Sequence, residues 1–307
     1  MKRYLLAMFL IGTCLYAQTD SKAQDQVIQK LSHGQVNWTN KVIVVTGSAA
    51  PNLKGGVVAA QVRLQTERAA ELDAYRKILE IVKGVRVDSS WTVGDMMQSV
   101  PEVRTTVEGL IKGMKRIDTK YYSDGGVDVI VQVDLEGMMA STVAKEVVKK
   151  VSDKKEEDAQ ATKEKTDKKD IKPALESKKE EIRKEEPKGK ESQKEEQKVA
   201  QSDVTGVIIN VKGHPYQPVM YPKILDDKNN ELFAVEKADP NLLNEGKLVS
   251  YYLSENAAKN SERVKDKPVI INAVSVKNKS EIIIRSDDAK KINRELLRNG
   301  RLAIIVD

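Results

Sequence analysis

The chain has 307 residues, of which 32% are charged and 4% aromatic, and 52 Lys and Arg against 46 Asp and Glu give a net charge of +6. This length predicts about two domains. The positive excess is small and comes without a basic cluster or aromatic stacking partners, so the composition argues against nucleic-acid binding.

The first twenty residues have the three-part layout of a secretory signal peptide. Lys2 and Arg3 precede an uncharged apolar run at residues 4–11 (YLLAMFLI), which is too short to span a bilayer. We expect cleavage after Ala17, which leaves Gln18 as the first mature residue. The protein is then exported, to the periplasm or the outer membrane.

Cys14 is the only cysteine and supports an alternative, in which it is acylated as in a lipoprotein. Residues 11–14 (IGTC) loosely match a lipobox, with Thr13 where Gly, Ala or Ser is usual. On either interpretation the mature protein has no free thiol and no disulfide. Thiolate catalysis and cysteine-based zinc sites are therefore excluded.

Residues 35–150 predict an α+β domain. A β-branched run at residues 41–48 predicts a buried strand, and apolar residues at three- and four-residue steps over residues 57–83 predict a long helix. The elements expected after it are an extended segment at residues 85–93, short helices at 95–98 and 101–110, strands at 114–122 and 127–135, and an amphipathic segment at 141–151. We expect the long helix to lie across a small, mainly antiparallel sheet.

A charged linker at residues 152–200 separates this domain from a second α+β domain at residues 202–307. About three in five linker residues are charged, nearly balanced in sign, and aromatic residues are absent, which predicts a disordered or helical segment. The second domain is expected to contain strands at residues 205–211, 219–225, 231–234, 268–276, 281–285 and 301–306, helices at 254–264 and 289–298, and a strand or helix at 248–253. We expect residues 268–276 to pair with residues 281–285 across the turn between them.

The helix-to-strand stretch of the first domain resembles a known family. Residues 67–76 (ERAAELDAYR), residues 83–89 (KGVRVDS) and residues 109–113 (GLIKG) are similar to a bacterial envelope family. That family groups small outer-membrane lipoproteins with flagellar protein P and the N-terminal domain of flagellar assembly protein T. The resemblance covers residues 53–137. It implies a surface or periplasmic component, in some members part of flagellar rings or disks, and it supplies no catalytic residues.

Candidate catalytic and metal-ligating residues are few. The two histidines, His33 and His214, lie far apart in the sequence, whereas a zinc site normally needs three or four ligands. No Gly-x-Ser-x-Gly elbow, Walker loop or dinucleotide fingerprint occurs. We therefore expect no enzymatic activity, no cofactor and no metal.

The sequence favours a structural or interaction component of the envelope, associated with the flagellar base or the outer membrane. The expected partners are other envelope or flagellar proteins, peptidoglycan, a lipid anchor or further copies of the chain. The alternative is a periplasmic module that binds cell-wall glycan or polysaccharide. That alternative requires exposed aromatic side chains near a groove, for which Trp91, Tyr251 and Tyr252 are the candidates.

Overall fold

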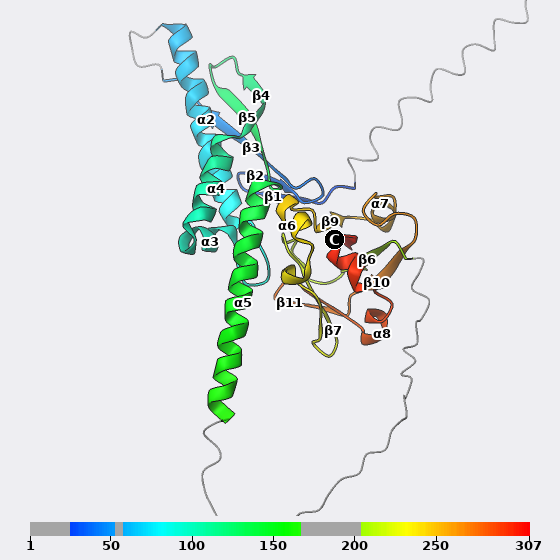
Figure 1. Cartoon of the computed structure of the whole chain (residues 1–307). Coiled ribbons are helices and arrows are strands. Elements are labelled where there is room, and N and C mark those ends of the chain that lie inside the picture. Colours follow the sequence, from blue (N-terminus) through cyan, green and yellow to red (C-terminus); the bar gives the residue numbers. More distant parts are fainter. Residues whose placement is uncertain (1–24, 53–57, 167–203) are drawn as a thin grey trace, which may run out of the picture.

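The protein is described here by a computed structural model, which covers residues 25–52, 58–166 and 204–307, with side chains up to residue 153 in the second range (Figure 1). The predicted cleavage site at Ala17 and Gln18 and the candidate acylation site at Cys14 lie outside the described residues. Within those residues the architecture is mixed α+β, which confirms the predicted fold class.

The first half of the chain forms a five-stranded antiparallel sheet with a long helix on one face. In sheet order, the strands are β1 (Ile28–Leu31), β2 (Gly34–Asn37), β3 (Val42–Ala49), β5 (Val127–Asp134) and β4 (Lys115–Tyr121). Helix α2 (Ala59–Gly84) packs on β3 and β5, as the sequence predicts. Strand β1 precedes the predicted start of the domain, because its sequence (IQKL) lacks the alternation that marks a strand.

Two features of the sequence hold α2 on the sheet. Strand β5 alternates buried valines with half-buried residues that are mostly polar, so the valine face meets the helix. Gly47 of β3 allows the closest approach, because a Cβ at this position would lie 2.1 Å from the carbonyl oxygen of Ala70 and 2.4 Å from the amide nitrogen of Ala74. The backbones of strand and helix therefore touch directly at Gly47.

Three further helices complete the first half. They are α3 (Val93–Ser99), α4 (Pro101–Lys112) and α5 (Met138–Thr166). Thr92 and Asp95 form a capping box at the start of α3, and Pro101 occupies the first turn of α4, where its missing N–H costs nothing. Helix α5 continues past the predicted domain end at residue 150, so the charged segment is helical up to Thr166.

The second half contains two four-stranded sheets. The first is entirely parallel, in the order β10 (Pro268–Asn272), β6 (Gly206–Asn210), β13 (Leu302–Ile305) and β9 (Val249–Tyr252). The second is mixed, in the order β11 (Ser275–Lys277), β12 (Glu281–Ile284), β7 (Lys223–Asp226) and β8 (Glu231–Phe233). Around them lie the short helices η1 (Val235–Lys237), α6 (Pro240–Glu245), α7 (Glu255–Lys259), α8 (Ser286–Ala289) and α9 (Arg294–Arg298).

The second half differs from the expectation in several places. The helix expected at residues 254–264 is only α7, which ends at Lys259, and α6 was not predicted. The predicted hairpin is shorter, because only β11 pairs with β12, while β10 joins β6 in the other sheet. The helix expected at residues 289–298 is divided into α8 and α9, since the side chain of Asn293 accepts a hydrogen bond from Glu295 N and starts a new helix. The long helix on an antiparallel sheet is thus a feature of the first half alone within the described ranges.

The two halves pack against each other around one continuous hydrophobic core. Segments of the two halves pair through their backbones: Met220 N donates to Arg86 O at 3.1 Å, and Tyr221 N donates to Val87 O at 2.9 Å. The hydroxyl of Tyr221 donates to Ala140 O in α5 at 2.8 Å. Figure 1 shows the second half seated beside the sheet and α5 of the first.

Candidate functional site at the junction of the two halves

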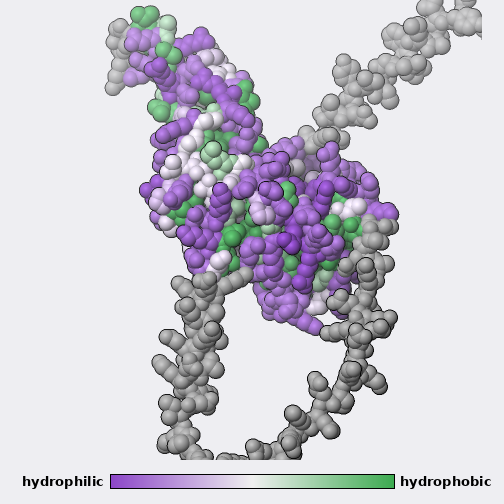
Figure 2. All heavy atoms as spheres, viewed as in Figure 1, coloured by the Kyte–Doolittle hydropathy of each residue, from purple (hydrophilic) through white to green (hydrophobic). Residues whose placement is uncertain are grey.

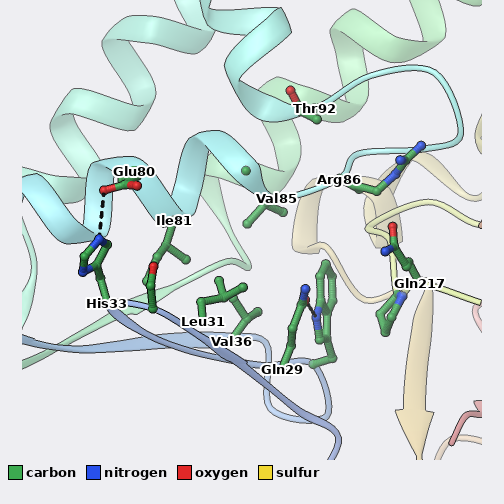
Figure 3. A pocket seen from close by; sticks show the side chains of 14 residues that line it. Gln29, Leu31, His33, Val36, Glu80, Ile81, Val85, Arg86, Thr92 and Gln217 are labelled. Carbon is green, nitrogen blue, oxygen red and sulfur yellow. Dashed lines mark hydrogen bonds and ion pairs between the residues drawn. The ribbon is translucent and has the colours of Figure 1, made fainter.

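A pocket of about 420 Å³ lies where the two halves meet (Figure 3). The β1–β2 hairpin forms one wall, the C-terminal end of α2 and the segment after it form another, and the loop at residues 217–218 closes it from the second half. We call this cavity the junction pocket. It is lined by Gln29, Leu31, Ser32, His33, Val36, Trp38, Glu80, Ile81, Gly84, Val85, Arg86, Thr92, Gln217 and Pro218.

Trp38 closes the floor of the junction pocket and is buried by the second half. Its ring meets the ring of Tyr251 edge to face, with centroids 5.9 Å apart. Its indole N–H donates to the side-chain oxygen of Gln29 at 2.9 Å. Because only 3% of Trp38 is exposed, the pocket has an aromatic floor without a free ring face for stacking.

Two carboxamides from different halves lie at the pocket. The Gln29 oxygen is occupied by Trp38, and its amide N–H₂ makes no hydrogen bond within the described residues. The exposed side chain of Gln217 makes none to any residue that the structure describes. The pocket therefore presents hydrogen-bonding groups that a ligand could satisfy.

The pocket lining contains one acidic side chain, Glu80, and one basic side chain, Arg86, besides His33. His33 Nε2 lies 3.8 Å from a carboxylate oxygen of Glu80, and both side chains are exposed, so the pair contributes little to stability. Arg86 turns its guanidinium toward the following loop, where it donates to Ser89 O at 2.8 Å (Figure 3). The net charge that a ligand meets is therefore small.

Arg86 also carries the one buried side-chain donor that has no hydrogen-bond partner among the described residues. Its Nε is buried and has no hydrogen-bond partner, which costs about 1–3 kcal/mol. Nearby, burial raises the pKa of Asp88, although the backbone N–H groups of Ser90 and Trp91 donate to its carboxylate and oppose the shift. These contacts shape the loop that forms the pocket wall.

The aromatic residues expected to contact a ligand do not come together. Tyr251 is fully buried, and its hydroxyl donates to Val219 O at 2.8 Å, so the expectation of an exposed Tyr251 is wrong. Its side chain is covered by Trp38 of the first half and by Tyr216 and Val219 of the second. Tyr252 points to the other side and packs on a small cluster of buried residues. Trp91 is half-buried, and the ammonium group of Lys150 lies 4.0 Å from its ring centroid.

The two histidines do not lie together and do not form a candidate metal site. His214 Nε2 lies 3.3 Å from Ala273 O in the second half, whereas His33 belongs to the junction pocket. No group of three or more His, Cys, Asp or Glu side chains in the described ranges is arranged to hold a metal ion. Sequence reasoning missed the junction pocket, because its lining comes from segments that only the docking of the halves brings together.

A second surface of interest is a protrusion of the first half, which we call the distal arm and define as residues 58–72 and 115–126. It contains the start of α2 and the β4–β5 turn, and it extends away from the rest of the molecule (Figure 1). Six of the eleven exposed large hydrophobic residues in the described chain belong to it: Val58, Leu64, Leu72, Ile117, Tyr121 and Tyr122. Figure 2 shows apolar patches among the polar atoms at this end.

The inner side of the distal arm is held by a polar network. Arg116 of β4 pairs with both Glu67 and Glu71 of α2, and the Tyr121 hydroxyl donates to Glu67 at 3.0 Å. Hydrogen bonds from Arg116 and Tyr121 hold the pKa of Glu67 below its usual range. The network fixes helix and strand to each other, so the outward apolar side chains stand on a defined surface.

Residues 206–307 match the family model described as the second domain of Treponema pallidum Tp0624. The match covers the second half of the chain as the structure describes it, apart from two residues at its start. The chain has no match among curated proteins. No helix of the described residues has the length and apolar character needed to cross a membrane.

Proposed function

We propose that the protein is a non-catalytic structural or interaction component of a bacterial cell envelope and that it contacts a partner protein through the distal arm. The observation that carries this proposal is the concentration of exposed apolar side chains on the arm, since such patches mark protein contact sites. The arm lies within residues 53–137, whose resemblance to outer-membrane and flagellar proteins supports the same function.

The arm offers side chains for contact more readily than backbone. Strand β4 is an edge strand, but a bulge at Ile117 interrupts its register, and Lys115, Asp118 and Lys120 are exposed along it. Bulges and charges of this kind block the addition of another strand. We therefore expect the partner protein to bind the outer face of α2, where Leu64 and Leu72 are at least half exposed.

The charge of the outer face of α2 indicates which charge the partner's surface should carry. Glu67 and Glu71 are turned inward to Arg116, whereas the exposed Arg68 makes no ion pair within the described chain. The outer face of the arm is thus apolar and positive. The partner is an envelope protein with an apolar patch that carries Asp or Glu.

A double substitution of Leu64 and Leu72 to Glu is expected to abolish this contact and leave the fold intact. Both side chains are exposed, so each change should alter stability by less than about 0.5 kcal/mol. The measurement is photo-crosslinking in the native cell from the exposed position Gln65, with the adduct identified by mass spectrometry. The matched control is Val274→Glu, an exposed apolar residue of the second half.

One adduct of defined mass, with an envelope protein crosslinked through an apolar and acidic segment, is the expected result. It should vanish in the double variant and in Arg68→Glu and persist in Val274→Glu. An adduct unaffected by these changes, or crosslinking spread over many proteins, would show that the arm is not a specific contact surface.

Export is tested on the mature protein by intact mass and envelope fractionation. We expect a mass that begins at Gln18 and a soluble periplasmic protein, or an acyl increment on Cys14 with the protein in the outer-membrane fraction. The second result identifies an anchored component. A full-length mass that starts at Met1, found in the cytoplasmic fraction, would refute the envelope location.

A further inference from the structure

The junction pocket is built from hydrogen-bonding groups that carry no net charge. The lining holds one acidic and one basic side chain, Glu80 and Arg86, and the guanidinium of Arg86 is bound to loop carbonyls. Ser32 adds an exposed hydroxyl. A lining of this kind favours an uncharged, polar ligand over an anion or a cation.

The two free carboxamides specify the ligand further. The Gln29 amide can donate, and Gln217 can both donate and accept, so together they match a ligand group that has one N–H and one C=O. A secondary amide has this pattern, as a hydroxyl does, but an acetamido group adds a methyl that the rest of the lining can receive.

The rest of the lining accommodates the apolar part of an acetamido group. Leu31, Val36 and Ile81 form an apolar wall on the side of Gln29, and Gln217 lies across the pocket near Arg86, as Figure 3 shows. Their side chains can receive a methyl group, and the buried Trp38 also lines the pocket. The volume of about 420 Å³ is in the range of small-ligand pockets, and it suits a short carbohydrate segment.

We propose that the junction pocket binds an uncharged carbohydrate through an N-acetyl group, which Gln29 and Gln217 recognise from the two halves. This site is independent of the distal arm, so either proposal can fail without the other. Because the ligand contacts both halves, it binds the docked arrangement and stabilises it.

The test is titration calorimetry of the full chain with a tetrasaccharide of N-acetylglucosamine, compared with cellotetraose, which carries hydroxyls where the first sugar has acetamido groups. We expect the N-acetylated sugar to bind at least about tenfold more tightly. Gln29→Ala and Gln217→Ala should each weaken it about threefold to tenfold, as expected for one lost hydrogen bond.

The matched control is Gln61→Ala, an exposed glutamine on the distal arm, which should bind like the unchanged protein. Thermal unfolding of each variant separates a lost contact from a lost fold, and the sugar-induced rise in Tm should be smaller in Gln217→Ala than in the unchanged protein. Equal affinity for both sugars would overturn recognition of the acetamido group. Absence of binding by either sugar at millimolar concentration would overturn the site.

Discussion

Replacement of Gly47 by alanine is expected to destabilise the protein by about 3 kcal/mol or more, which is the upper range for overpacking. The added methyl group would lie 2.1 Å from Ala70 O and 2.4 Å from Ala74 N, and both are backbone atoms of α2. Helix backbone cannot rotate away as a side chain can. The helix must lift from β3, and the valines of β5 then lose their cover. Urea unfolding of the two proteins measures the effect.

Gly109→Ala is the matched control. Gly109 is an exposed residue inside α4, and a Cβ there meets nothing within 4 Å. Alanine lowers the conformational entropy of the unfolded chain, so this change should stabilise the protein by about 0.5–1 kcal/mol. Equal effects of the two substitutions, or a Gly47→Ala protein as stable as the original, would contradict the direct contact between strand and helix.

The second large effect is a dependence of stability on pH that originates at Lys41. This residue is buried between the halves, and its ammonium group donates to Gly246 O of the second half. Burial, together with the nearby cations Arg263 and Lys247, lowers the pKa of Lys41 to about 7, while Glu136 opposes the shift. Because Gly246 O is its one acceptor among the described residues, a protonated amine would leave N–H groups unsatisfied.

The direction of the effect follows from the two pKa values. The unfolded chain holds the Lys41 proton up to its ordinary pKa of 10.5, whereas the folded protein releases it near 7. The unfolded state therefore binds more protons in this window, and stability rises with pH. The titration of Lys41 should raise the free energy of unfolding by about 2 kcal/mol between pH 7 and pH 9. Above about pH 10 stability falls again, because burial raises the pKa of Tyr216, Tyr221 and Tyr251 and the unfolded tyrosines ionise first.

Urea unfolding at a series of pH values from 6 to 9.5 measures this rise. Lys41→Met removes the titrating group and should flatten the profile, whereas Lys120→Met, at an exposed position on β4, should leave it unchanged. A rise that persists in Lys41→Met would assign the pH dependence to other groups. Since Lys41 contacts the second half, the same profile also reports on docking of the halves.

Local sequence patterns predicted several elements of the first half. The three- and four-residue spacing of apolar residues predicts α2 within two residues at each end, and Pro101 marks the start of α4. The turn between β4 and β5 and the valine alternation of β5 are equally local signals. Each of these elements is specified by neighbours in the chain, which is why a single sequence suffices to predict them.

Strand pairing in the second half could not be predicted from such local patterns. Strands β10, β6, β13 and β9 are short apolar runs, and parallel neighbours need long connections, so nothing local states their order. The nearest antiparallel partner is then the natural guess for residues 268–276, and it holds only for β11. The burial of Tyr251 could not be predicted from the sequence either, because β9 shows no alternation that separates a covered face from an exposed one.

The sequence by itself determined the α+β class and the long helix on the antiparallel sheet, and it left open whether the charged segment after residue 151 is disordered or helical. The tertiary structure alone decided that Lys41 is buried and that Gln29 and Gln217 line one pocket. The reason is physical: periodicity reports which side of an element is apolar, but burial and pocket lining depend on which distant surface docks there. Here that surface is the other half of the same chain.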